Sequence, residues 1–499
     1  MLSSISLAGG ELTVDLTDDD NTTIRANGGN IEILINGSAD SFAPALTSVT
    51  HIVVNGSAGA NTIDLSAVTE TNGFVSGLTV TLVGGDGNDE LIGSGFDDFL
   101  DGGAGDDRLT GAAGDDVFTG GAGTDRVIES GDHDFTISDS GLTGLGTDTF
   151  ADAIETATLT GGAGNNTIVA SNYYGNVTIY GEDGDDYLVG SYGDDIIYGG
   201  NGNDTLIGSA GFNLLYGNNG NDILRASYSW SEFDGGDGYD RISEDMDASF
   251  VATGGLQDLT INVNNGQFVN TAINVERLVL KGKGGNNTID VSGTTIDTAI
   301  EGHGGNDTLI AGVGTYWIDG GDGTSDTLIF QQDADMTLTD AQLTFGAFSA
   351  TIQNIEFAEL TGGASDNVLD ASTFSGSVTL VGGDGNDYLI GTVNDDFLDG
   401  GAGDDRLLGS GGNDDLQGGS GTNLVASTNV APTGYADSYS VHWGATLDIA
   451  AAAGLLANDV DADNNALAVL ITHPPAWGTL TANSDGGFTY EHSGIGLSP

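Results

Sequence analysis

The chain of 499 residues carries 74 aspartates and glutamates against 9 lysines and arginines, a formal net charge of −65. Such a surface repels nucleic acid and anionic membranes, which excludes both as partners. Cysteine is absent, so disulfides and thiolate metal sites are excluded as well. No apolar run reaches the roughly 18 residues of a membrane span. Residues 1–14 also lack the basic start and apolar stretch of a signal peptide, so we expect any export to use another signal.

Residues 1–83 form a β-rich lead-in. The segments 12–16 (LTVDL) and 31–35 (IEILI) alternate apolar and other residues with a period near two, as half-buried strands do. The segment 56–64, GSAGANTID, is the first glycine-rich nonapeptide, and it has Asn61 at its sixth position where later units have aspartate.

Array 1 is an unbroken run of five nonapeptides at 84–128: GGDGNDELI, GSGFDDFLD, GGAGDDRLT, GAAGDDVFT and GGAGTDRVI. Each begins with glycine, has aspartate at the sixth position and an apolar residue at the eighth. The sixth-position aspartates are candidate metal ligands: Asp89, Asp98, Asp107, Asp116 and Asp125. The glycines that we assign to the same sites are Gly85, Gly87, Gly103 and Gly105.

Array 2, at 181–243, follows a β-rich spacer at 129–180 and contains seven such units. Its candidate ligands are Asp186, Asp195, Asp204, Asp222 and Asp240, with Gly184, Gly200 and Gly202. Two units have Asn213 and Ser231 at the sixth position, so we expect these coils to bind a cation poorly.

The last two arrays differ in how regularly they keep the nine-residue period. After a β-rich spacer at 244–301, array 3 (302–329) is degenerate, because Tyr316 stands at a sixth position and one extra residue precedes Asp326. After a further spacer at 330–381, array 4 (382–426) is regular until it fades at Asn423. Its candidate ligands are Asp387, Asp396, Asp405 and Asp414, with Gly383, Gly385, Gly401 and Gly403.

A longer repeat encloses these arrays. Strand-like segments (DFTIS, DLTINV and DMTLT) are followed by a segment with glutamate (AIETATLT, NVERLVL and NIEFAEL), then by an asparagine-bearing nonapeptide, then by an array. The chain is therefore predicted to consist of four tandem super-repeats, of which the first is the most divergent at its start.

The units GGDGNDELI, GGAGDDRLT, GGNGNDTLI and GGDGNDYLI resemble the calcium-binding nonapeptides of bacterial repeats-in-toxin (RTX) proteins. This resemblance implies a right-handed parallel β-roll, an all-β solenoid in which six residues form a turn, three form a short strand, and two units complete one coil. It also implies that calcium lies between stacked turns, held by backbone carbonyls and the sixth-position aspartates.

The residue types agree with this resemblance independently. Glycine at positions one and four would let the backbone take positive φ. Aspartate supplies the charged oxygen that a hard cation prefers. The eighth residue would form a narrow core that cannot alone offset the ordering cost of about 1–2 kcal/mol per residue. We therefore expect the arrays to depend on calcium, whereas Asn166 and Asn287 are expected to stack as a structural ladder.

Ions that bridge aspartates two units apart would occupy about eight sites. The acidic pairs are Asp89/Asp107, Asp107/Asp125, Asp98/Asp116, Asp186/Asp204, Asp204/Asp222, Asp222/Asp240, Asp387/Asp405 and Asp396/Asp414. We expect the chain to be disordered inside the cell, where such sites would be almost empty, and folded outside it.

Residues 427–499 differ in composition, because four of the five prolines fall there and glycine loses its period. The segment resembles the cadherin-like or immunoglobulin-like modules of bacterial adhesins, which implies a β-sandwich. Asp459, Asp461 and Asp463 match an acidic stretch of that family, and a solvated acidic turn is the alternative. The closing strands are lacking, so we expect an incomplete module.

No catalytic residues are predicted. The six histidines form no H-E-x-x-H motif, and no G-x-S-x-G is present. We expect a calcium-binding structural or adhesive protein, extracellular or on a bacterial cell surface and exported by a non-classical or type I route. Its expected partners are calcium ions, with cell-surface or matrix glycans or proteins as further candidates. Two alternatives remain: the export and folding module of an exoenzyme, and a polysaccharide-active β-helix.

Overall fold

The computed structural model describes residues 4–227, 229–264, 266–427, 433–442, 444–460, 467–471 and 473–492. Within these residues the chain is all β, with 3-10 turns at η1 (Leu46–Ser48), η2 (Glu70–Asn72) and η3 (Ala451–Ala453) and no α-helix. Two compact units, 1–326 and 327–499, make up the chain. The expected all-β solenoid with parallel strands is confirmed in the repeat-bearing part of both units.

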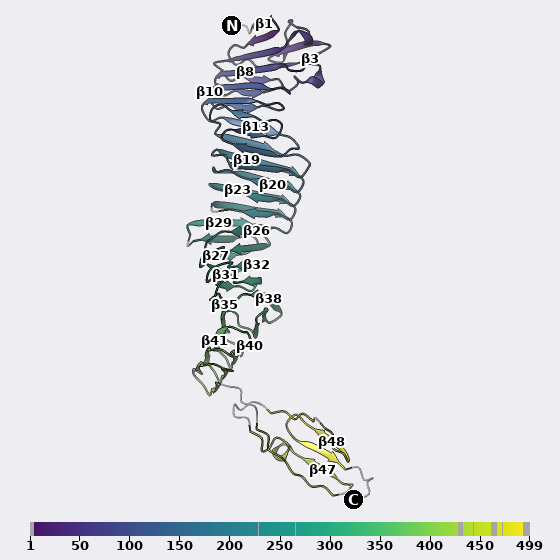
Figure 1. Ribbon diagram of the computed structural model, residues 1–499, viewed down its shortest axis with the longest axis vertical. Helices are drawn as coiled ribbons and strands as arrows, with labels where there is room; N and C mark the ends of the chain where they lie inside the picture. The colour runs from purple at the N-terminus through teal and green to yellow at the C-terminus, as the bar shows by residue number, and fades with distance from the viewer. Residues whose placement is uncertain are drawn as a thin grey trace. The chain divides into compact units, whose positions relative to one another are not determined.

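Unit 1 is a stack of coils. Each coil contributes short strands, and these pair in parallel with the strands of the next coil along the axis (Figure 1). One sheet contains β2 (Glu11–Asp15), β6 (His51–Ser57), β8 (Thr79–Asp86), β10 (Asp98–Ala104), β12 (Val117–Ala122) and β16 (Thr149–Phe150), with β1 (Ser4–Ala8) antiparallel to β2.

The facing sheet of unit 1 also runs in parallel from coil to coil. It contains β3 (Thr22–Asn27), β7 (Thr62–Asp64), β9 (Glu90–Ile92), β11 (Arg108–Thr110), β13 (Arg126–Ser130), β17 (Thr156–Thr160), β19 (Asn176–Asp183), β21 (Ile196–Asn201), β23 (Phe212–Asn219), β25 (Trp230–Asp237) and β29 (Phe268–Ile273).

From the spacer at 129–180 onward two further sets of parallel strands continue unit 1. The first set is β14 (Phe135–Ser138), β18 (Thr167–Asn172), β20 (Tyr187–Val189), β22 (Thr205–Ile207), β24 (Ile223–Arg225), β26 (Arg241–Asp245), β30 (Arg277–Lys281), β32 (Asp297–Glu301) and β34 (Thr315–Asp319). The second set is β27 (Phe250–Gly254), β31 (Thr288–Thr294) and β33 (Thr308–Ala311).

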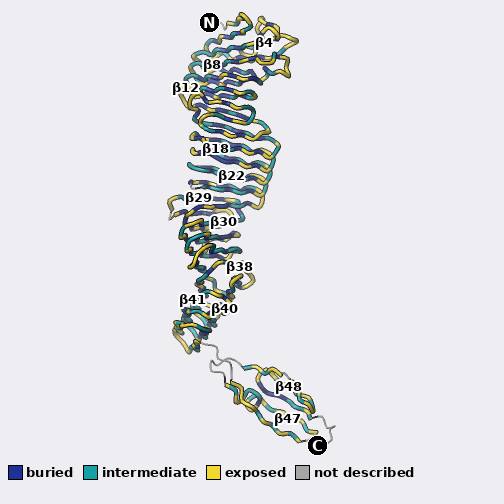
Figure 2. Tube along the Cα trace, viewed as in Figure 1, coloured by how far each residue is buried: buried dark blue, intermediate teal, exposed yellow. Residues whose placement is uncertain are grey.

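The register of these strands explains the nine-residue period. Leu91 pairs with Leu109 on one sheet, and Leu100 pairs with Phe118 on the other. Successive nonapeptides therefore lie on opposite sheets, so that two units complete one coil as expected. All four of these eighth-position side chains have no exposed surface, and buried residues follow the strands while exposed residues gather at the turns (Figure 2). A core of one large side chain per unit is thus confirmed.

The turns are shorter than expected on one side of the roll. The parallel pairing of β8 with β10 continues through Gly85–Gly103 and Asp86–Ala104. These residues occupy positions two and three of their nonapeptides, which we had assigned to the turn. The difference arises because the backbone at these positions still forms hydrogen bonds with the next coil.

Antiparallel hairpins interrupt the coils once in each super-repeat. In unit 1 they are β3 with β4 (Asn30–Ile35) and β5 (Ser38–Ala39), β14 with β15 (Gly141–Thr143), and β27 with β28 (Leu259–Val263) and β29. The strand that opens each of them pairs in parallel with the strand of the asparagine-bearing nonapeptide. These hairpins are the segments that lengthen the super-repeat beyond its nonapeptides.

Unit 2 begins with the same construction. One parallel set is β35 (Thr327–Gln331), β39 (Phe357–Thr361), β41 (Ser377–Asp384), β43 (Phe397–Ala402) and β45 (Asp415–Gln417). The other is β36 (Met336–Thr339), β40 (Val368–Thr373), β42 (Tyr388–Ile390), β44 (Arg406–Leu408) and β46 (Leu424–Ala426), with a hairpin of β36, β37 (Gln342–Phe345) and β38 (Phe348–Gln353).

The described C-terminal residues contain one antiparallel sheet of β47 (Thr446–Ile449), β49 (Phe488–Glu491) and β48 (Thr479–Ala482). A sandwich requires a second sheet, and none is found among the residues described at 433–492. Asp459 accepts a hydrogen bond from the Tyr435 amide, 2.6 Å from its Oδ1. Asp461 and Asp463 lie outside the described residues, so the adhesin-like module stays a prediction.

Candidate calcium sites

The sixth-position aspartates form ladders along the coil axis. The amide of Asp89 donates to Oδ1 of Asp107 at 2.7 Å, and the amide of Asp107 donates to Oδ1 of Asp125 at 3.0 Å. Each bond joins residues 18 positions apart, which is one coil. Parallel stacking of identical turns therefore places these carboxylates in a row.

All eight predicted pairs are neighbours in such ladders. The remaining amide-to-Oδ1 distances are 2.8 Å for Asp98/Asp116, 2.8 Å for Asp186/Asp204, 2.8 Å for Asp204/Asp222, 2.8 Å for Asp222/Asp240, 3.0 Å for Asp387/Asp405 and 3.2 Å for Asp396/Asp414. Asp195 lies in a ladder too, but its amide donates to Asn213 at 3.1 Å.

Array 3 contains a ladder pair that the sequence analysis did not identify. The amide of Asp307 donates to Oδ1 of Asp326 at 2.7 Å. The extra residue before Asp326 is accommodated in the turn, so the two side chains still meet. The inserted residue had hidden this pair because it breaks the period of nine.

The second carboxylate oxygen of most of these aspartates is buried and accepts no hydrogen bond. This holds for Oδ2 of Asp89, Asp107, Asp116, Asp125, Asp186, Asp204, Asp222, Asp240, Asp307, Asp387, Asp405 and Asp414. Among the residues that the structure describes, the ion pairs of basic side chains involve none of these oxygens, since they join Arg25 to Glu32, Lys281 to Glu301, Lys283 to Asp245 and His303 to Glu301. A buried charged oxygen without a partner is costly, and a bound cation would remove that cost.

Glycine at position one makes room for this oxygen. A Cβ built on Gly84 would lie 2.3 Å from Oδ2 of Asp89 and 2.5 Å from the carbonyl oxygen of Gly102. The oxygen of one coil and the carbonyl of the next thus border the same small space. Any side chain at position one would fill it.

Positive φ belongs to positions two and four, not to positions one and four as we had predicted. Gly85 has φ 108° and Gly87 has φ 107°, and both are among the predicted site glycines. The error has a physical reason: position one needs a glycine for space, whereas positions two and four need one for backbone conformation. Glu182, at position two of its unit, has φ 77°, so a side chain is tolerated there when it points to solvent.

In three predicted ligands the second carboxylate oxygen, Oδ2, accepts a hydrogen bond from the protein. The Ser191 amide donates to Oδ2 of Asp195 at 2.7 Å, and the Thr392 amide donates to Oδ2 of Asp396 at 2.6 Å. Asp98 is held in the same way by Ser94, whose hydroxyl also donates to Oδ1 at 2.7 Å. A serine or threonine at position two can therefore satisfy the aspartate of its turn without a cation, although Ser410 does not do so for Asp414, whose Oδ2 accepts no hydrogen bond.

Protein hydrogen bonds stabilise the turns of Asn61 and Asn166, whereas Oδ1 of Asn287, which we expected to behave like Asn166, is buried and accepts no hydrogen bond. Oδ1 of Asn166 accepts the Gly162 amide at 2.8 Å. Nδ2 of Asn61 donates to the carbonyl oxygen of Asp20 at 2.7 Å, and its Oδ1 accepts the Ser57 amide at 2.7 Å. Each asparagine then begins a ladder, because its own amide donates to the first aspartate.

Glutamates from the spacers end the ladders, and the sequence analysis missed them. Oε2 of Glu155 accepts the amide of Asp125 at 2.9 Å, and Oε2 of Glu276 accepts the amide of Asp240 at 2.7 Å. Both follow a buried apolar residue in the super-repeat, Ile154 and Val275. The recurring pair of an apolar residue and glutamate in AIETATLT and NVERLVL was the signal that could have found them.

A second ladder, also missed, runs along position five. The Asp106 amide donates to Oδ1 of Asn88 at 3.0 Å, and the Thr124 amide donates to Oδ1 of Asp106 at 2.8 Å. Asparagine and aspartate both serve here because the position is exposed and only an acceptor oxygen is needed. The recurrence of these two residues at position five was visible in the sequence.

The sites fit a hard cation such as calcium. Calcium binds oxygen ligands only, including backbone carbonyls and carboxylates, and both border the space beside position-one glycines such as Gly84 and Gly102. In the described part of the chain no three Asp, Glu or His side chains come together as a metal-binding group. A cation here would therefore take main-chain carbonyls as ligands in addition to the aspartates.

Burial raises the pKa of several of these carboxyl groups. Burial and the charge of Asp98 raise the pKa of Asp116 to about 8. Burial raises the pKa of Asp222 to about 7 and that of Asp107 to about 6, although a backbone hydrogen bond opposes the shift in both. The calcium-free arrays should therefore bind protons near neutral pH, where an exposed aspartate would be ionised.

Acidification should stabilise the calcium-free chain. Because the pKa is higher in the folded state than in the unfolded state, the folded chain binds more protons between about pH 4 and pH 8, and its stability falls as pH rises through this window. In calcium-free buffer we expect more β-sheet signal in circular dichroism at pH 5 than at pH 8. With calcium the order should reverse, since protons compete with the ion. A calcium-free chain that loses its β-sheet signal on acidification to pH 5 would contradict this account.

Asp107 and Asp98 should differ in their effect on calcium binding. Asp107 lies between two aspartates of its ladder, whereas Asp98 has one ladder aspartate and is held by Ser94. We expect Asp107→Asn to raise the calcium concentration at the folding midpoint more than Asp98→Asn does. Calcium titrations followed by circular dichroism measure both midpoints, and equal values would count against the stacking of ions along the ladder.

A family model described as the RTX calcium-binding nonapeptide repeat (4 copies) matches the chain at 81–95, 92–127, 157–172, 174–197, 198–227, 361–398, 379–407 and 390–425. No curated protein matches the chain. The matches cover nearly all of arrays 1 and 4 and array 2 up to residue 227, and the aspartate ladders of these arrays carry unpartnered buried oxygens. The chain therefore contains RTX calcium-binding nonapeptide repeats.

Proposed function

We propose that the chain is a structural or adhesive segment of a secreted or cell-surface protein, and that its arrays fold when they bind calcium outside the cell. One observation supports this most: rows of buried carboxylate oxygens have no protein partner. A chain with a net charge of −65 cannot neutralise these rows with its own 9 basic residues. A divalent cation from the medium supplies the missing charge.

The calcium concentration outside cells suits sites of this kind. Extracellular calcium modules bind with dissociation constants near 10⁻⁴–10⁻³ M, so the sites would be almost empty in a cytosol. No described helix is long and apolar enough to cross a membrane. RTX repeats are typical of secreted proteins, which supports export by a type I route. We propose about eight calcium ions per chain, one for each ladder pair of arrays 1, 2 and 4.

Calcium should control folding of the arrays. Each site occupied at tenfold its dissociation constant adds about 1.4 kcal/mol to the free energy of unfolding. We expect the β-sheet signal in circular dichroism to be weak with a chelator at neutral pH and to rise cooperatively at about 0.1–1 mM calcium. Magnesium, which keeps its hydration water more firmly, serves as the control ion. Full β-sheet signal at micromolar calcium would sink the proposal.

We propose no catalytic role for this chain, and a structural role needs none. The histidines stand apart in the sequence, and the ladder carboxylates are buried rather than gathered around a substrate cavity. The chain as the export and folding module of an exoenzyme is the alternative, because the same calcium-dependent arrays would serve it. A catalytic domain encoded beside this segment would favour that alternative.

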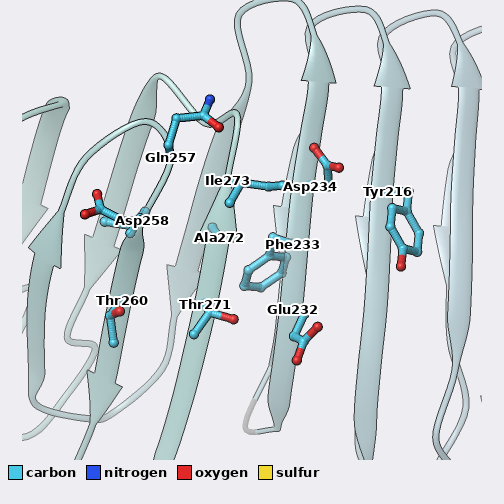
Figure 3. A pocket seen from close by; sticks show the side chains of 11 residues that line it. Tyr216, Glu232, Phe233, Asp234, Gln257, Asp258, Thr260, Thr271, Ala272 and Ile273 are labelled. Carbon is cyan, nitrogen blue, oxygen red and sulfur yellow. The ribbon is translucent and has the colours of Figure 1, made fainter.

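Glycans are the second candidate partner, and one cavity in unit 1 favours them. It has a volume of about 420 Å³, within the range of small-molecule sites. Tyr216 from β23 and Glu232 and Asp234 from β25 line it, together with Gln257 and Thr271 (Figure 3). An aromatic ring beside carboxylate and amide groups suits a sugar, which has both apolar faces and hydroxyl groups.

The ring of Tyr216 ends a column of tyrosines. Its centroid lies 4.9 Å from that of Tyr198, which lies 5.0 Å from that of Tyr180. The next coil has Asp234 in place of a tyrosine, in register with Tyr216. The column therefore stops at the cavity, and the last ring faces it without a further ring beyond.

Substitution of Tyr216 should weaken glycan binding selectively. We expect Tyr216→Ala to weaken binding of a neutral glycan about tenfold, because the ring surface is lost. An array of neutral and anionic glycans, read in calcium, identifies the ligand, and anionic glycans should bind least because the chain is acidic. Tyr192→Ala is the matched control, since this tyrosine also stacks, on Tyr174, but lies outside the cavity lining. Absence of glycan binding by the native chain would remove this candidate.

A further inference from the structure

A glutamate outside the nonapeptide pattern lies at the end of array 1. Glu129 in β13 is 2% exposed. Its Oε1 accepts the amide of Gly111 at 2.8 Å and that of Ala112 at 3.2 Å. Its Oε2 is buried and accepts no hydrogen bond. The side chain is thus fixed by one oxygen, and the other is left without a partner.

Glu129 takes the place of a main-chain carbonyl. A Cβ built on Gly93 would meet Oδ2 of Asp98 at 2.4 Å and the carbonyl oxygen of Gly111, one coil further, at 2.6 Å. A Cβ built on Gly111 would meet Oδ2 of Asp116 at 2.3 Å, and its three nearest atoms include no main-chain oxygen. Glu129 is 18 residues after Gly111, where the next glycine would stand. Its carboxylate therefore borders the space that a carbonyl borders elsewhere.

A third carboxylate comes from the hairpin segment that follows. Asp148 immediately precedes β16 and is 7% exposed. Its Oδ1 accepts the amide of Asp116 at 3.0 Å, so it continues the ladder although it is 32 residues away in the sequence. The charges that act on Asp116 come from Asp98, Asp148 and Glu129, and all of them are acidic.

We propose that Asp116 and Glu129 hold a calcium ion that closes the Asp98 ladder, with Oδ2 of Asp116 and Oε2 of Glu129 as ligand atoms, and that Asp148 positions Asp116 through its backbone amide. The proposal rests on the calcium binding proposed above for the arrays. Oxygen ligands and the excess of negative charge suit calcium rather than a softer metal. Carbonyl oxygens or water complete the coordination, because calcium takes 6–8 ligands and two side chains cannot supply them alone.

Array 2 contains an equivalent glutamate, Glu244, but neutral residues replace the two aspartates that accompany Glu129. Oε1 of Glu244 accepts the amide of Ala226 at 2.8 Å, also 18 residues apart. Ser231 stands in the place of Asp116, and its amide donates to Oδ1 of Asn270, which stands in the place of Asp148, at 3.0 Å.

Two further differences close the second position to a cation. Ala226 stands in the place of Gly111, and its Cβ occupies the kind of space that a Cβ on Gly111 would take from the Asp116 carboxylate. Arg225 also acts on Glu244 with a positive charge, whereas an acidic neighbour, Asp148, acts on Glu129. The two positions are therefore a matched pair, one suited to calcium and one not.

The pair gives the experiment its control. Calcium bound per full-length chain is counted by equilibrium dialysis at saturating calcium for the native chain, Glu129→Gln and Glu244→Gln. Glutamine keeps an acceptor oxygen for the two amides that Glu129 holds. We expect Glu129→Gln to bind one ion fewer than the native chain, and Glu244→Gln to bind the same number.

The possible outcomes distinguish a failure of the Glu129 site from a failure of calcium binding by the arrays as a whole. A native chain that binds no calcium would overturn the function proposed for the arrays. If the native chain binds calcium and Glu129→Gln binds the same number of ions, only the site at Glu129 is overturned. The same holds if Glu129→Gln lowers the thermal midpoint without changing the ion count, because a purely structural cap would do so.

A gain-of-site variant tests the proposal if Glu129→Gln fails to fold. The quadruple substitution Arg225→Thr, Ala226→Gly, Ser231→Asp and Asn270→Asp reproduces the array 1 arrangement around Glu244, since Thr110 precedes Gly111 in array 1. We expect it to bind one ion more than the native chain. An unchanged count in a variant whose calcium-saturated circular dichroism equals that of the native chain would overturn the proposal.

Discussion

The repeat-bearing part of this protein depends on one unsatisfied interaction: in most array nonapeptides a buried aspartate at the sixth position uses one oxygen within the protein and leaves the other without a hydrogen-bond partner. The first oxygen links each coil to the preceding one through a backbone amide. The second cannot remain ionised and bare without a large free-energy cost. It must bind a proton or a cation, so folding of the arrays is coupled to both.

Each array has a defined start, and arrays 1 and 2 also have a defined end. Asn61, Asn166, Asn287 and Asn367 each donate their amide to the first aspartate of a ladder at 2.7 Å. Glu155 and Glu276 accept the amide of the last aspartate. A neutral amide is suited to the start, where backbone amides donate to Oδ1 of Asn61, Asn166 and Asn367, although Oδ1 of Asn287 accepts no hydrogen bond. A longer carboxylate is suited to the end, where the following coil lies in a spacer of different backbone path.

Much of the fold and of the site could be predicted from local pattern. The period of nine, the aspartate at position six and the apolar residue at position eight predicted the parallel coils, the core residues such as Leu91, and the eight ladder pairs. The pattern could not reveal Glu129 or Asp148, because each reaches the ladder from outside the repeat. It also concealed the Asp307/Asp326 pair, since an inserted residue is invisible to a strict period but is absorbed by a turn.

The sequence by itself determined the all-β coil, the spacing of carboxylates along it and the excess of negative charge, because these follow from residue type and period alone. Only the tertiary structure decided which buried carboxylate oxygens lack a hydrogen-bond partner. Asp98 and Asp107 both occupy the sixth position of a nonapeptide. Ser94 donates hydrogen bonds to both carboxylate oxygens of Asp98, whereas Oδ2 of Asp107 accepts none. Likewise Glu129 and Glu244 are both buried glutamates that cap a turn, and only their neighbours in space distinguish them. Hydrogen bonds and charges across coils set these differences, and they act between residues that lie far apart in the chain.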